Sequence, residues 1–331
     1  MRYLRGDVLV IGSKYAYSFG RVKALEAALL DRTQLRRMVE APTAVEAVKI
    51  LSETSYAAIP EGADIPAIET VLQGELRNIY DLAQKISPRR ELTDLLQLKY
   101  DFHNAKLILK SEIASREPTH MVPLGIVDIT RLKKAFKERV KDLPPPLANA
   151  IEKARLLYEE TGDTQILDLA MDSEYVRALM EQFEEVPFFK EFFQMKIDLE
   201  NIRNFLRCQK FKVEFEKAYI EGGTVDLKTF LGFEGEPVET IINAFHVKKY
   251  DTVVEEGLKD YEETGTLTLY EKLTEDLLLE YLKKAKMVTL GIEPLIGYML
   301  AKEREIKQIR LILIGKLKGI DIEKRVGDPY G

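Results

Sequence analysis

The sequence predicts an all-α fold built from three similar helical repeats. Apolar residues recur at the three- and four-residue spacing of helices almost throughout the 331 residues. One ten-residue pattern also occurs three times along the chain. Strand-like alternation is nearly absent, and residues 8–11 form the only weak candidate for a strand. These three observations favour helical bundles in series over a mixed or β fold.

The first repeat is predicted to cover residues 1–117. Apolar residues at helical spacing predict one helix from Tyr17 to Met38. A second short helix should follow Pro42 and end at Leu51, because Thr43 and Glu46 have the spacing of a capping box. Two longer helices are expected at 66–86 and 89–114.

The second and third repeats are predicted at residues 118–221 and 222–331. Prolines 118 and 123 mark the first boundary, and Gly222–Gly223 is interpreted as the linker that opens the third repeat. The tail from Gly319 is expected to fray because it is rich in glycine, proline and charge. The predicted helices are 128–141, 147–158, 164–183, 188–211, 227–231, 237–244, 250–261, 267–287 and 292–317.

The repeated pattern places an acid, an amide and a base at fixed positions. The segments YDFHNAKLIL, IDLENIRNFL and REIKQIRLIL align without gaps, and their acids are 97 and 107 residues apart. Units of that size are close to small domains of their own. The acids are Asp101, Asp198 and Glu305; the amides are Asn104, Asn201 and Gln308; the bases are Lys106, Arg203 and Arg310.

A second signal recurs with the same period. The pentapeptide YEETG begins at Tyr158 and again 103 residues later, and LSETSY holds the matching place in the first third. An acidic position then follows in each copy, at Glu69, Asp168 and Glu271. Two sets of matches in the same order indicate that the chain is a triplication.

On a helical wheel, the repeated acid and base flank an apolar stripe on opposite sides. Groups five residues apart cannot face each other on one helix, so each must reach a neighbouring helix. We therefore expect the acid of each copy to pair with a base on an adjacent helix. An alternative is that the three acids converge to bind a cation or to perform acid–base chemistry. The structural interpretation is favoured because repetition alone explains the matching positions.

The composition argues against several classes of function. The net charge is −6 with both signs well mixed, which predicts no nucleic-acid partner. No apolar run reaches the ~18–20 residues that span a bilayer, so a soluble or peripheral protein is expected. The single cysteine, Cys208, is predicted to be an inert buried thiol.

No catalytic or cofactor-binding motif is recognisable. The three histidines, His103, His120 and His246, lack the spacing of metal ligands, and no glycine-rich phosphate loop is present. The sequence therefore predicts no cofactor, no small-molecule substrate and no enzyme.

Three segments together resemble a known family. These are YAYSFGRVKALEAALLD with LSETSYA, FFQMKIDLENIRNFLRCQKF, and GIEPLIGYMLAKEREIKQIRLILIGKLKGI. The chain resembles the C subunit of the archaeal and bacterial V/A-type rotary ATPases, which is homologous to the d subunit of the eukaryotic vacuolar ATPases. The resemblance covers essentially the whole chain.

The resemblance implies a funnel-shaped protein of three similar bundles around a pseudo-threefold axis. It further implies a non-catalytic central-stalk subunit of the rotor, peripheral on the cytoplasmic side of the membrane. Its partners would be the central-shaft subunits, which it receives in a socket, and the membrane rotor ring. The nine repeated polar residues become candidates for the funnel wall.

Two other functions stay open on the residues alone. A free-standing helical adaptor would bind soluble partners and show no preference for the rotor. A helical enzyme using the repeated carboxylates would lose activity when any one of them is replaced.

Overall fold

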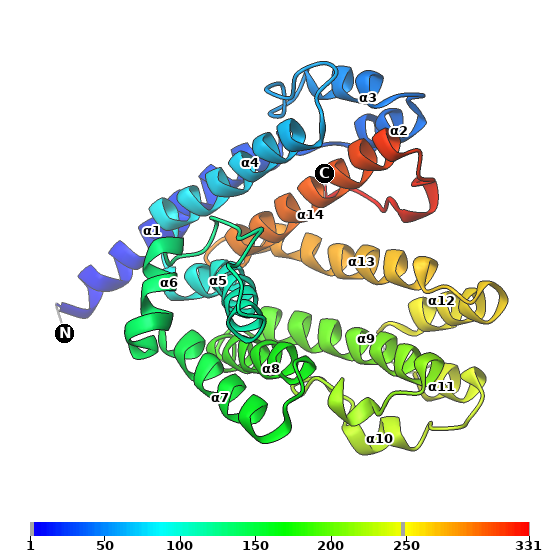
Figure 1. The fold of residues 1–331 in the computed structure, drawn as a ribbon. Helices are drawn as coiled ribbons and strands as arrows, with labels where there is room; N and C mark the ends of the chain where they lie inside the picture. Colours follow the sequence, from blue (N-terminus) through cyan, green and yellow to red (C-terminus); the bar gives the residue numbers. More distant parts are fainter. Residues whose placement is uncertain (1–2, 246–248, 331) are drawn as a thin grey trace. The chain divides into compact units, whose positions relative to one another are not determined.

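The computed structural model describes residues 3–245 and 249–330, and these residues form α-helices and short 3-10 helices without any β-strand (Figure 1). The predicted all-α class is confirmed. The chain divides into two compact units, one made of Met1–Arg90 with Gly235–Gly331 and the other of Glu91–Glu234. Each unit is described by itself below.

The continuous unit holds most of α5 and the next five α-helices. α7 and α8 form an antiparallel hairpin (Figure 1), and Gly162 ends α7 with the positive φ of 67° that favours glycine. An aromatic cluster fills the core around α9, where the ring centroids of Phe205 and Phe230 lie 5.9 Å apart. Its helices are α5 (Arg90–Ile113), α6 (Ile129–Glu138), α7 (Pro145–Thr161), α8 (Gln165–Gln182), α9 (Pro187–Phe211) and α10 (Leu227–Leu231), with 3-10 turns η1 (Val140–Asp142) and η2 (Phe215–Lys217).

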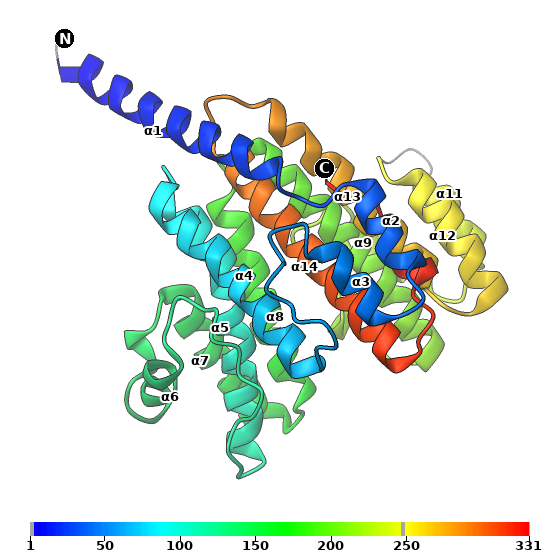
Figure 2. The ribbon, with the colours of Figure 1, turned by 90° about the horizontal axis from the view of Figure 1, so that it is seen from above.

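The discontinuous unit combines helices from both ends of the chain. α14 packs against α1, α3 and α4, which precede it by more than 200 residues (Figure 2). Its helices are α1 (Tyr3–Glu26), α2 (Arg32–Glu40), α3 (Ala44–Leu51), α4 (Ile65–Ile86), α11 (Val238–Phe245), α12 (Asp251–Thr264), α13 (Thr268–Lys283) and α14 (Glu293–Lys318), with 3-10 turns η3 (Lys284–Met287) and η4 (Glu323–Arg325).

The core of this unit lies between α4 and α14. Leu72 on α4 and Ile306, Ile309 and Leu313 on α14 are fully buried. These α14 residues recur every three or four positions, so one side of the helix is apolar. Gly319 ends α14 with a φ of 65°.

One predicted helix is wrong, because residues 17–38 do not form a single helix. α1 ends at Glu26 and α2 begins at Arg32. Asp31 caps α2 by accepting a hydrogen bond from Gln34 N, while the Gln34 side chain accepts one from Asp31 N. The apolar spacing continued across the break since Leu29 and Leu30 are buried in the connection. The weak strand candidate at 8–11 is also wrong, because those residues lie within α1.

The prediction of a fraying tail is wrong as well. Tyr330 is only 4% exposed, and its carbonyl accepts a hydrogen bond from Lys286 Nζ at 2.7 Å. Asp328 forms an ion pair with Arg32 at 2.7 Å, which links the tail to the start of α2. Burial of the terminal aromatic side chain outweighs the flexible composition of the segment. The repeat boundaries and the pseudo-threefold funnel stay predictions.

Candidate functional site

The repeated acids of the first two copies lie on the longest helices of their unit and are fully buried. Asp101 on α5 accepts hydrogen bonds from Ile126 N at 2.8 Å and Val127 N at 3.2 Å. Asp198 on α9 accepts from Thr224 N at 2.8 Å and Val225 N at 3.2 Å, and from the Thr224 hydroxyl at 2.6 Å. Both aspartates therefore bind the backbone just before the next short helix.

Each of these backbone segments ends in an aspartate that caps the following helix. Asp128 accepts from Thr130 N and Arg131 N at the start of α6, and Asp226 accepts from Thr229 N at the start of α10. The buried acid of one copy thus holds the entry to the first helix of the next copy. We call this arrangement a joint: the repeated acid, the amide beside it and the backbone segment that they bind.

A glycine makes room for the carboxylate in both joints. A Cβ atom on Gly125 would lie 2.1 Å from Asp101 Oδ1, and one on Gly223 would lie 2.2 Å from Asp198 Oδ1. No side chain can replace glycine there unless the carboxylate moves. Gly223 is therefore part of a joint, and its interpretation as a simple linker residue was incomplete.

The repeated amides complete the first two joints in the same way. Asn104 donates to Val122 O and accepts from Val122 N, both at 2.8 Å. Asn201 makes the same pair of bonds with Ile220, also at 2.8 Å. Both asparagines are fully buried, so these bonds satisfy polar groups that water cannot reach.

The third acid makes the equivalent joint with the beginning of the chain. Glu305 on α14 accepts a hydrogen bond from Leu30 N at 2.5 Å, just before the capping residue Asp31. Glu305 also accepts from the Tyr56 hydroxyl at 2.8 Å and from Lys302 Nζ at 2.7 Å. In this copy the acid is the longer glutamate. The position that aligns with Gly125 and Gly223 is Ala28.

The third amide uses the tail instead of an inter-repeat segment. Gln308 Nε2 donates to Gly327 O at 2.9 Å. Arg304 on the same helix donates to Asp328 O at 2.8 Å, and Asp276 on α13 accepts from Asp328 N at 2.9 Å. The tail therefore fills the place that residues 122 and 220 occupy in the other joints.

Lys106 and Arg310 each reach an acid on another helix. Lys106 on α5 pairs with Asp172 on α8 at 2.7 Å, and Arg310 on α14 binds both carboxylate oxygens of Glu69 on α4 at 2.7 and 3.0 Å. Arg203 pairs with Glu200 on its own helix. Glu69 is one of the acidic positions that follow the second repeated signal, so the two repeated patterns meet in this contact.

The hypothesis that each acid pairs with a base on an adjacent helix is wrong for Asp101 and Glu305. Asp101 accepts backbone N–H groups, and the base that pairs with Glu305 among the described residues is Lys302 of the same helix. A helical wheel shows which side of a helix a group occupies but not whether a loop or a helix covers it. The missed signal was G-x-V-D at Gly125 and Gly223, 98 residues apart and followed by a helix in both copies.

Burial opposes the charge on Asp101. The lack of water around this carboxyl raises its pKa to about 6, although the bonds from Ile126 N and Val127 N act in the opposite direction. Burial also raises the pKa of the Cys208 thiol. Both carboxylate oxygens of Asp101 accept hydrogen bonds from the backbone. This supports the structural interpretation over acid–base chemistry.

Within residues 3–245 and 249–330, no group of three or more histidine, cysteine, aspartate or glutamate side chains is arranged to hold a metal ion. His103 and His120 belong to this part of the chain, whereas His246 lies outside the described residues. None of the described helices combines the length and the apolar composition that crossing a bilayer requires.

Comparison with known proteins identifies the family. The family model of the ATP synthase (C/AC39) subunit matches residues 19–325. The C subunit of the A-type ATP synthase of Methanocaldococcus jannaschii is 27% identical, with 94% of this chain and 84% of the relative aligned. The C subunit of the V-type sodium ATPase of Enterococcus hirae is 25% identical, with 92% of this chain and 94% of the relative aligned.

The relatives are similar along nearly their whole length, and the resemblance inferred from the three sequence segments is confirmed. These relatives are named as the C subunits of an ATP synthase and of an ATPase, which is consistent with the predicted non-catalytic role. Because the family model covers most of this chain, the protein belongs to the ATP synthase (C/AC39) subunit family and is a subunit of an A/V-type ATPase complex.

Proposed function

We propose that this protein is a central-stalk subunit of the rotor, which links the central shaft to the membrane rotor ring and transmits torque between them. The observation that carries the proposal is the family match over residues 19–325. The protein would sit on the cytoplasmic side of the membrane as a peripheral subunit, with the three repeats arranged as a funnel whose socket receives the shaft.

The three joints support a mechanical role. A part that transmits torque must resist sliding of one helix pair against the next. In each joint a buried carboxylate accepts one or two backbone N–H groups at the entry to a helix, with hydrogen bonds of 2.5–3.2 Å. Hydrogen bonds to charged groups contribute roughly 1.5–3 kcal/mol each and are directional, so they resist such sliding.

A two-step titration tests the proposal. The purified chain is titrated by calorimetry with the isolated central-shaft subunits, and detergent-solubilised rotor ring is then added to the complex. We expect both partners to bind at the same time. A chain that binds neither would be a free-standing adaptor, and a chain that binds only one could not transmit torque.

A further inference from the structure

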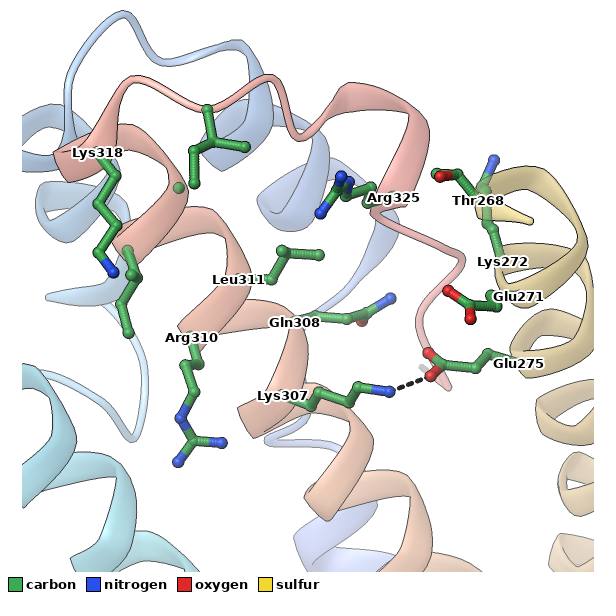
Figure 3. Close-up of a pocket in the computed structure, with 13 residues that line it drawn as sticks. Thr268, Glu271, Lys272, Glu275, Lys307, Gln308, Arg310, Leu311, Lys318 and Arg325 are labelled. Carbon is green, nitrogen blue, oxygen red and sulfur yellow. Dashed lines mark hydrogen bonds and ion pairs between the residues drawn. The ribbon is translucent and has the colours of Figure 1, made fainter. Parts of the chain in front are cut away.

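A basic groove runs along the side of α14 that faces α13. It encloses about 550 Å³ and is lined by Thr268 to Glu275 of α13, Lys307 to Lys318 of α14 and part of the tail. Figure 3 shows the labelled side chains of both helices around this hollow, with Leu311 lying between them. The α14 part extends over 12 residues, which is about 17 Å or three helical turns.

The charges of the groove differ from those of the whole chain. Five lining residues are cations (Lys272, Lys307, Arg310, Lys318 and Arg325), and two are anions (Glu271 and Glu275). The complete chain carries a net charge of −6. A local excess of positive charge on an acidic protein indicates a surface that attracts an acidic partner.

Three of these cations are available for a partner. Lys307 is paired with Glu275 (Figure 3), and Arg310 is held by Glu69. Among the described residues, Lys272, Lys318 and Arg325 have neither an ion pair nor a hydrogen bond to another side chain.

The floor of the groove is apolar. Leu311 and Ile314 are half-buried on α14, and Ile320 of the tail is 46% exposed at one end. A groove with an apolar floor between two neighbouring helices fits the apolar side of a third helix. Cations at the rim would then face acidic residues on the flanks of that helix.

Taking the proposed rotor function as given, we propose that this groove binds an acidic amphipathic helix of the central shaft. The occupant would place apolar side chains at helical spacing on Leu311, Ile314 and Ile320. Aspartates or glutamates beside this stripe would pair with Lys272, Lys318 and Arg325. The groove thus identifies the chemistry of the shaft segment that enters the socket.

A charge-reversal series on the full chain tests this. The variant K272E/K318E/R325E is titrated by calorimetry with the isolated central-shaft subunits and compared with the control K85E/K137E/K228E. The control lysines are exposed and do not line the groove. We expect the groove variant to raise Kd at least about 30-fold at low salt, the control to change it little, and high salt to reduce the difference.

The outcomes separate the groove from the rotor function. If the wild type binds the shaft and both variants bind equally well, the groove inference is overturned and the rotor function stands. If the wild type does not bind the shaft, the proposed function falls and the groove inference with it. If the groove variant instead abolishes self-association in analytical ultracentrifugation, the occupant is a second copy and the inference is wrong.

A cross-linking experiment locates the occupant independently of affinity. Cys208 is the only cysteine and is buried, so R325C in a C208S background carries a photo-cross-linker at the groove alone. We expect the attached shaft peptide to be rich in aspartate and glutamate with apolar residues at helical spacing. The matched variant K137C should attach no shaft peptide. Attachment of R325C only to ring subunits would overturn the assignment.

Discussion

At the scale of single residues, the buried carboxylates depend on a match in size with their neighbours. Asp101 and Asp198 each face a glycine whose Cβ would lie about 2 Å from a carboxylate oxygen. Glu305, which is one methylene longer, faces a segment with Ala28 at the aligned position. The same joint is thus built in two ways: two copies combine an aspartate with a glycine, and the third combines a glutamate with an alanine.

Gly125→Ala should destabilise the protein strongly. The new methyl group would displace the Asp101 carboxylate from Ile126 N and Val127 N and leave a buried charge without donors. We expect a loss of about 2–4 kcal/mol in the free energy of unfolding, measured by urea denaturation.

Gly74→Ala on α4 is the matched control. A Cβ there meets nothing within 4 Å, so alanine should stabilise the helix by about 0.5–1 kcal/mol. Equal effects of the two substitutions would mean that Gly125 is not required for space.

The raised pKa of Asp101 predicts a pH dependence of stability. The pKa of this carboxyl is about 6 in the folded state and its ordinary value is 3.8, so the group stays protonated to a higher pH in the folded state than in the unfolded state. The unfolded state loses the proton first, so the free energy of unfolding falls as pH rises from about 4 to 6. Each pKa unit corresponds to about 1.4 kcal/mol, so Asp101 contributes a decrease of about 3 kcal/mol.

Urea denaturation at pH 4 and pH 7 measures this contribution when the wild type is compared with Asp101→Asn. The substitution removes the titrating group, so the wild type should lose about 2.4 kcal/mol more than the variant between these pH values. The same change in both proteins would show that Asp101 titrates normally.

At the scale of helices, α14 makes the same kinds of contact with the first copy that α5 makes with the second copy. The base of α5 binds an acid on α8, and the base of α14 binds an acid on α4. α5 and α14 also hold the backbone before a capped helix through their acids. α14 therefore connects the two ends of the chain with the same kinds of contact that α5 makes to the copy that follows it: a base paired with an acid on another helix, and an acid bound to the backbone before a capped helix.

The Arg310–Glu69 pair should be energetically coupled. Both side chains are half-buried, and two hydrogen bonds fix the geometry. A double-mutant cycle with R310Q and E69Q should give about 1 kcal/mol of coupling. The exposed pair Arg36–Glu40 on α2 is the control, and its cycle should show no coupling beyond experimental error. Similar coupling in both pairs would contradict a specific role for Arg310.

At the scale of the whole molecule, the two units differ in how their chains are connected. The unit of residues 91–234 is continuous and contains the joints of Asp101 and Asp198. The other unit depends on contacts across the sequence, such as Leu30 with Glu305, which are 275 residues apart. Closing such long loops costs chain entropy before any contact is gained.

The connectivity predicts that one piece of the chain folds alone and another does not. A fragment of residues 91–234 should unfold cooperatively in urea, because its core and both of its joints are complete. A fragment of residues 1–90 should lack a cooperative transition, since α14 provides much of the surface against which α3 and α4 pack. A folded 1–90 fragment would show that α14 is not needed for this part of the core.

The all-α class, most helices and the repeated pattern could be predicted from the sequence because helical periodicity and repetition are local. Gly125 and Gly223 could have been found in the same way, since each precedes an aspartate cap by three residues. The break before Asp31 was missed because Leu29 and Leu30 are buried in a connection and continue the apolar spacing.

The sequence by itself determined most of the helices, which polar residues are repeated and to which family the chain is similar. Only the tertiary structure decided that the buried acids bind backbone amides, that Glu305 closes onto Leu30 and that the tail completes the third joint. The physical reason is that side-chain spacing specifies the side of a helix, whereas the partner on that side comes from a distant segment. That partner is selected by burial, by available space and by the need to satisfy every buried polar group.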